Sequence, residues 1–261
     1  MLTLFTYKIE GFKMKKLLLL TTLTASLFAI SSQDVAKKSY DVISGYKSSL
    51  SKTTMILKNA QGVENIRKLE MKKIEGEDGD KSLLNFLYPE DLKGTKLLSF
   101  EVIGGDDKQW LYLPSLKRTK RISSRNKSGS FMASEFSYED ISSQNYKNYS
   151  YSGEAEEVTK DGVTYYKVTR TPIDVNSGYS KQMVWVDKSN FLAKYGEYYD
   201  KQNRLLKKIH FSEYKVIDGI QRIVKIEIEN IQNGKSSSLT WDEDMIDAGI
   251  KGGELSKRAL K

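Results

Sequence analysis

Few side chains in this 261-residue sequence have the types and spacing that covalent catalysis requires. His210 is the only histidine, and it lies in a strand-like stretch with no cysteine or second histidine to share a metal. The acidic run at residues 242–244 lacks the spacing of known calcium loops. The Gly-Gly pair at 104–105 lacks the helix and Lys-Ser/Thr pair of a phosphate-binding loop. We therefore expect a protein that is not an enzyme and that needs neither a metal nor a cofactor.

The stretch from residue 104 to residue 140 combines aromatic and basic side chains that suit non-covalent binding. The strand-like run WLYL supplies three candidates for contact with an apolar ligand: Trp110, Tyr112 and Leu113. Both alternating faces of this run are apolar, so we expect it to be covered on both sides. The basic run KRTKRI follows and supplies three candidates for the rim of a site: Arg118, Lys120 and Arg121.

These cations could bind phosphate head groups or the acidic face of a partner, because arginine binds such oxygens bidentately. The alternative is a solvated edge strand that is protected from pairing by its charge. Basic strands beside aromatic residues also bind single-stranded nucleic acid. The moderate net charge of +8 and the secretory segment described below argue against that function.

The polar loop that comes next keeps four large apolar or aromatic side chains: Phe131, Met132, Phe136 and Tyr138. We interpret them as a lid over an apolar cavity, with ordinary core packing as the alternative. Such a lid should be loosely held, because a tightly held one would not release a ligand.

Residues 1–31 are expected to be an N-terminal extension and a secretory signal peptide. Three lysines between positions 13 and 16 precede a short apolar run that ends in small residues, too short to span a bilayer. Residues 1–29 carry a net charge of +3, so about +5 of the total remains afterwards. The chain has no cysteine, which excludes disulfides and a lipid-modified cysteine. We expect a soluble protein of the periplasm.

Residues 32–261 are expected to form a single domain. Residues 34–50 have helical periodicity, and from residue 53 onward alternating strands follow one another across short turns. Ten to twelve strands at such spacing predict an antiparallel meander, since parallel neighbours need long crossovers. A sheet of that size curls or closes. The sequence therefore predicts a mainly β protein with a few helices: a strongly curved antiparallel sheet whose concave apolar face is covered by the helix and by the loop at 123–140.

The runs WLYLPSLKRTKRIS and SFMASEFSYED closely resemble the signature of the outer membrane lipoprotein-sorting, or LolA-like, family. The matching positions are Trp110, Tyr112, Leu113, Pro114, Arg118, Arg121, Ile122, Ser130, Phe131, Ser134, Phe136, Ser137, Tyr138, Glu139 and Asp140. Glu135 stands where that signature has aspartate. The resemblance implies an incomplete β-barrel with helices in its open side, and a periplasmic carrier that shields lipid or lipoprotein acyl chains.

The function expected from these observations is non-catalytic transport of lipid or lipoprotein acyl chains between membranes. Its partners would be an inner-membrane transporter and an outer-membrane acceptor, and the protein would be a monomer. The alternative is an envelope lipid sensor or accessory protein that works with a transporter of the resistance-nodulation-division type. An enzyme that acts on lipids is a further alternative, for which His210 and residues 242–244 are the only candidates.

Overall fold

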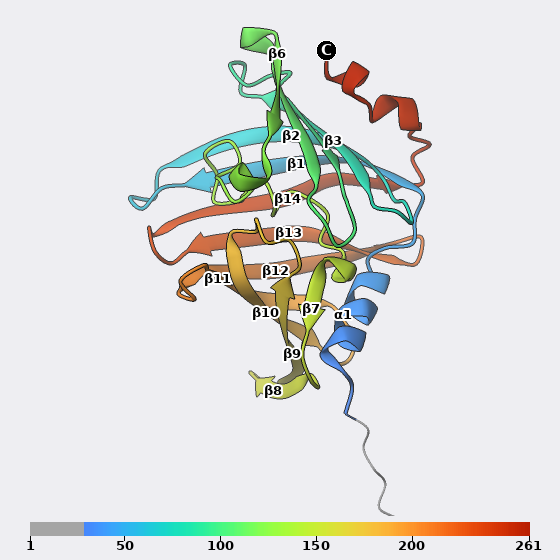
Figure 1. Cartoon of the computed structure of the whole chain (residues 1–261), viewed down its shortest axis with the longest axis vertical. Coiled ribbons are helices and arrows are strands. Elements are labelled where there is room, and N and C mark those ends of the chain that lie inside the picture. Colours follow the sequence, from blue (N-terminus) through green and yellow to red (C-terminus); the bar gives the residue numbers. More distant parts are fainter. Residues whose placement is uncertain (1–28) are drawn as a thin grey trace, which may run out of the picture.

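The computed structural model describes residues 29–261, which form one antiparallel sheet of 14 strands and a single α-helix (Figure 1). The first six strands are β1 (Ser48–Lys58), β2 (Glu64–Ile74), β3 (Lys81–Tyr88), β4 (Lys96–Phe100), β5 (Lys108–Leu113) and β6 (Arg118–Ile122). Then come β7 (Tyr149–Tyr151), β8 (Glu156–Lys160), β9 (Val163–Pro172), β10 (Tyr179–Asp187), β11 (Ala193–Asp200), β12 (Leu205–Ile217), β13 (Ile220–Asn230) and β14 (Lys235–Ile246). The sheet is curved and is not closed into a barrel, as the sequence predicts.

Strand order explains how one chain builds so wide a sheet. Consecutive hairpins run outward from β1 to β6 on one side, and inward from β9 to β14 on the other. β14 pairs with β1 and so joins the two halves at the centre. β7 forms the edge opposite β6, and β8 pairs with β9 off the main path. The connection from β6 to β7 must therefore travel the full width of the sheet.

That connection, residues 123–148, crosses the concave face (Figure 1). Because side chains alternate along a strand, every second residue of each strand points to this face. On neighbouring strands, Met55 lies directly opposite Leu239, and Leu69 lies opposite Phe86. The crossing segment adds Phe131 and Phe136 to the same cluster, and both are buried. The main core thus lies between the sheet and its own crossover connection.

The convex face has a smaller core under the C-terminal segment. Two short 3₁₀ turns, η4 (Gly252–Glu254) and η5 (Lys257–Leu260), lie over β3 to β5. Their Leu255 and Leu260 are buried against Leu98 and Trp110. Both faces of β5 are covered, as its sequence predicts.

The helix α1 (Ser32–Asp41) is shorter than the predicted 34–50. Ser31 caps its first turn by accepting a hydrogen bond from the Asp34 N–H at 3.0 Å. It ends before Gly45, whose φ of +104° favours glycine, and β1 starts three residues later. Within residues 29–261 no helix is long and apolar enough to cross a membrane. The predicted signal peptide falls almost wholly in residues outside the described range.

Candidate functional site

The crossing segment leaves part of the concave face open beside α1, and two adjoining lobes form a cavity there. The lobes share Tyr40 and Ile43 at the C-terminal end of α1, Phe136 and Asp140 of the crossing segment, and Ile226 of β13. One lobe is mainly apolar and the other contains several charged groups. The cavity is therefore amphiphilic along its length.

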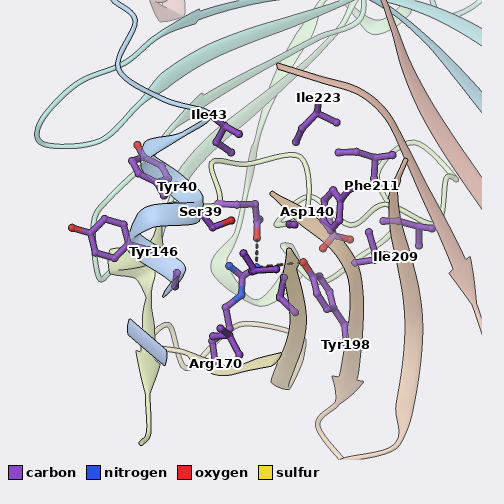
Figure 2. A pocket seen from close by; sticks show the side chains of 18 of the residues that line it. Ser39, Tyr40, Ile43, Asp140, Tyr146, Arg170, Tyr198, Ile209, Phe211 and Ile223 are labelled. Carbon is purple, nitrogen blue, oxygen red and sulfur yellow. Dashed lines mark hydrogen bonds between the residues drawn. The ribbon is translucent and has the colours of Figure 1, made fainter. Parts of the chain in front are cut away.

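The apolar lobe is open to solvent on one side and lies between α1 and strands β9 to β13 (Figure 2). The strand residues at its wall include Val168, Val184, Ile209, Phe211, Ile226 and Ile228. Ala36 and Tyr40 of α1 form the opposite wall, since residues four apart share one side of a helix, and Ile43 extends that wall just after the helix ends. The lobe has the lining expected for an apolar ligand.

Arg170 of β9 is the cation of the apolar lobe. Its Nε donates to the Gln182 side chain at 2.8 Å. Its Nη2 donates to the Tyr198 hydroxyl at 3.3 Å, as Figure 2 shows. The guanidinium also lies 3.9 Å from the centre of the Tyr149 ring. Burial raises the pKa values of Tyr149 and Tyr198, so both phenols stay neutral. Arg170 makes no ion pair within residues 29–261, so no carboxylate of the described chain neutralises its charge.

The charged lobe is built around Lys73 of β2. The Lys73 ammonium lies 2.7 Å from a carboxylate oxygen of Asp80 and 3.6 Å from one of Glu75. Burial alone would lower the pKa of Lys73, but Tyr46, Asp80 and Glu75 outweigh burial and raise it. Burial raises the pKa of nearby Glu101, although the Asp80 N–H donates to its carboxylate at 2.9 Å.

A second ion pair closes the far side of the charged lobe. Arg222 of β13 binds Asp244 of β14 through two hydrogen bonds of 2.7 and 3.1 Å. Its guanidinium lies 4.6 Å from the centre of the Tyr46 ring. Such groups can hold a polar head group, but none of them forms a nucleophile–base pair. Within residues 29–261 no three His, Cys, Asp or Glu side chains gather as metal ligands.

The segment that the sequence suggests as a lid is packed firmly into the concave face. Phe131 is fully buried, with its ring 5.8 Å from Phe86 and 5.5 Å from Tyr138. Met132 is partly buried, and its carbonyl accepts a hydrogen bond from Arg67. Among the four predicted residues only Phe136 lines the two lobes.

Buried polar groups fix the end of this segment to β10 and β12. The Asp140 carboxylate lies 2.7 Å from the Lys207 ammonium, and both side chains are less than a tenth exposed. The Tyr179 hydroxyl donates to Asp140 at 2.8 Å. Glu139 accepts the Gly178 N–H at 2.8 Å, and a Cβ at Gly178 would lie 2.6 Å from the Cβ of Ser128. The segment acts as a plug, and we call residues 128–141 the plug below.

The other predicted residues lie outside the cavity. Trp110 and Tyr112 project from the convex face and pack under the C-terminal segment. Leu113 lies on the opposite face of β5, beside the main core. Alternation along the strand causes this separation, because successive side chains point to opposite faces. Arg118, Lys120 and Arg121 are exposed on the edge strand β6, away from both lobes.

Sequence reasoning did not identify most of the cavity wall. Tyr40, Arg170, Tyr198 and Ile223 come from parts of the chain separated by up to 183 positions. The available signals were the apolar face of the N-terminal helix and the alternating aliphatic residues of β9 to β13. The charged lobe had no local signal, because Lys73 and Arg222 resemble ordinary strand cations.

Solved structures place this chain in a family. A domain from Vibrio parahaemolyticus, assigned as an outer membrane lipoprotein-sorting protein, has 39% sequence identity and a TM-score of 0.83. That match covers 87% of this chain and 97% of the other. A DUF1329 family protein from Desulfovibrio piger has 32% identity and a TM-score of 0.82, and the match covers 88% and 98% of the two chains.

A LolA superfamily protein from Nitrosomonas europaea shares the fold, with a TM-score of 0.73 at 20% identity over 88% of this chain and all of the other. A family model described as an uncharacterized protein matches residues 78–261. No curated protein sequence matches the chain. The chain belongs to the LolA-like family of outer membrane lipoprotein-sorting proteins.

Proposed function

We propose that this protein is a non-catalytic periplasmic carrier that binds the acyl chains of a lipid or lipoprotein and moves them between membranes. The two-lobed cavity carries the proposal. Its apolar lobe suits hydrocarbon, and its charged lobe suits the polar group to which hydrocarbon is attached. The V. parahaemolyticus relative is assigned to lipoprotein sorting, which supports the same class of ligand.

The free energy gained by removing an acyl chain from water is large enough for an apolar cavity alone to bind it. Each buried CH₂ group of an acyl chain contributes about 0.8 kcal/mol, so a chain of roughly 16 carbons costs on the order of 12 kcal/mol in water. A carrier must shelter that surface and later release it, and no bond needs to be made or broken. Arg170 lies within the apolar lobe and is positioned to bind a phosphate or carboxylate near the start of the chain.

The direct test is to purify the protein from the periplasmic fraction and to identify extracted lipid by mass spectrometry. In parallel, an apolar fluorophore is titrated into the delipidated protein, and transfer of a labelled lipid is followed from donor to acceptor vesicles. Protein that contains no lipid and binds no fluorophore would exclude the carrier function. Binding without transfer would favour the lipid sensor.

A substitution in the wall tests whether the ligand occupies this cavity. Ile223 lines both lobes, and Figure 2 shows it in the wall of the apolar one, so Ile223→Trp should fill part of the space. We expect it to weaken fluorophore binding by at least about tenfold, which corresponds to 1.4 kcal/mol. Val216→Trp is the control, because Val216 is 62% exposed. Equal binding by the wild type and Ile223→Trp, with both proteins folded, would place the ligand elsewhere.

A further inference from the structure

One end of the sheet carries a concentrated positive charge from two segments that are far apart in sequence. We call this surface the basic tip, and it comprises Lys117, Arg118, Lys120, Arg121, Lys257, Arg258 and Lys261. All seven residues are exposed. The first four belong to the β5–β6 hairpin, and the other three belong to the C-terminal segment.

Contacts on the convex face bring the two segments together. The Lys257 ammonium lies 4.4 Å from the centre of the Trp110 ring, and Arg121 is the cross-strand partner of Trp110. The Lys96 ammonium of β4 donates to the carbonyl of Ala259 at 2.8 Å and fixes the C-terminal turn beside β5. The hairpin and this turn lie near each other at the top of the sheet (Figure 1).

The charge of the basic tip is not neutralised by the protein. Within residues 29–261 none of the seven cations lies within ion-pair distance of a carboxylate. Other exposed lysines of the chain do have such partners, for example Lys52 with Glu243 at 2.9 Å and Lys188 with Glu157 at 2.6 Å. Seven unpaired cations on one surface repel one another, and an anionic surface would relieve that repulsion.

The turn of the hairpin also exposes an apolar side chain among these cations. Leu116 is 62% exposed and precedes Lys117, whose φ of +48° reverses the chain at this point. The hairpin ends in an edge strand and offers no pocket for a folded partner. A leucine surrounded by lysine and arginine is typical of segments that lie at a membrane surface.

We propose that the basic tip docks this protein on the surface of an anionic lipid bilayer. The cations would lie near the lipid phosphates, and Leu116 would enter the boundary between head groups and acyl chains. This inference concerns where the protein meets a membrane and goes beyond the ligand of the cavity. The tip is far from the two lobes, so the two functions can be tested separately.

The test is co-sedimentation of the purified full chain with vesicles of phosphatidylglycerol and phosphatidylcholine, or of phosphatidylcholine alone. Intact mass confirms the same N-terminus in every variant. We expect binding to the anionic vesicles only, and loss of binding as salt rises from about 0.1 to 1 M, where the screening length falls from about 10 to 3 Å. Each cation removed should weaken partitioning by about fivefold. The triple variant Arg118→Gln, Lys120→Gln, Arg121→Gln should therefore lose about a hundredfold.

The matched control replaces three exposed lysines on other parts of the sheet: Lys47→Gln, Lys208→Gln and Lys235→Gln. It removes the same net charge and should bind anionic vesicles within about fivefold of the wild type, the effect of one cation. Leu116→Ser should weaken the binding that persists at high salt. The tip variants should still bind the apolar fluorophore, which separates this test from that of the cavity.

Three results would overturn the proposal. The first is an absence of binding to anionic vesicles, or equal binding to neutral ones. The second is an equal loss of vesicle binding in the control and in the tip variant, which would mean that binding depends on the net charge of the protein and not on the basic tip. The third is binding of the tip variant to anionic vesicles as strong as that of the wild type, which would mean that the basic tip does not contact lipid.

Discussion

Removal of the Lys207 ammonium should release the plug from the sheet. Lys207 lies 2.7 Å from Asp140, and also donates to the Tyr179 hydroxyl at 2.7 Å. Lys207→Met keeps most of the side-chain volume but leaves a buried carboxylate without its countercharge. Breaking a buried ion pair in this way costs about 3–5 kcal/mol. We expect that loss in the free energy of unfolding, measured in urea by tryptophan fluorescence.

The double variant separates the ion pair from simple loss of packing. Asp140→Asn with Lys207→Met removes both charges, so it should be more stable than the sum of the two single variants predicts, by about 1–3 kcal/mol. Lys208→Met is the control, because this neighbour on β12 is exposed and unpaired within residues 29–261. A loss below about 1 kcal/mol for Lys207→Met, the size expected of an exposed pair, would contradict the conclusion that the plug is fixed electrostatically.

Three further predictions follow from the same contacts. Burial and the neighbouring Asp140 raise the pKa of Glu139, so this group favours the folded state below pH 4.5, and the contribution is lost as pH rises through the folded pKa. Glu139→Gln should therefore gain urea resistance relative to the wild type as pH rises above about 4.5, and a constant difference would contradict the shift. Trp110→Ala should cost about 3–5 kcal/mol of stability but leave fluorophore affinity unchanged. In hydrogen exchange measured by mass spectrometry, amides of residues 131–140 should be protected longer than those of α1, since the Phe131 N–H donates to Phe136 at 2.7 Å within the core. Faster exchange in the plug than in α1 would instead support the interpretation of this segment as a mobile lid.

The alternating pattern and short turns of the sequence were enough to predict the curved antiparallel sheet. The signature around residues 110–140 was enough to predict that the chain between β6 and β7 enters the concavity. The tight packing of this segment was not predictable, because it depends on Lys207, Tyr179 and Gly178, which lie 38 to 67 positions after Asp140. The sequence also could not predict which face of the sheet Trp110 occupies, since both faces of WLYL are apolar. Only the packing of the C-terminal segment on one face distinguishes them.

Strand order decides where a ligand can enter this fold. The plug packs on β2 and β3, where Phe131 contacts Phe86 and Arg67 holds the carbonyl of Met132, and Asp140 fixes its end to β10 and β12. Space remains over β9 to β13, where α1 forms one wall and the crossing segment, through Phe136 and Asp140, forms another.

This helix is short, and only Ser32 and Val35 within it are buried. One wall of the cavity is thus a strongly packed plug and the other a weakly packed helix. An element with few buried contacts needs less free energy to move. The wall that opens for a ligand should therefore be α1, and the signature motif should supply the fixed surface against which the ligand lies.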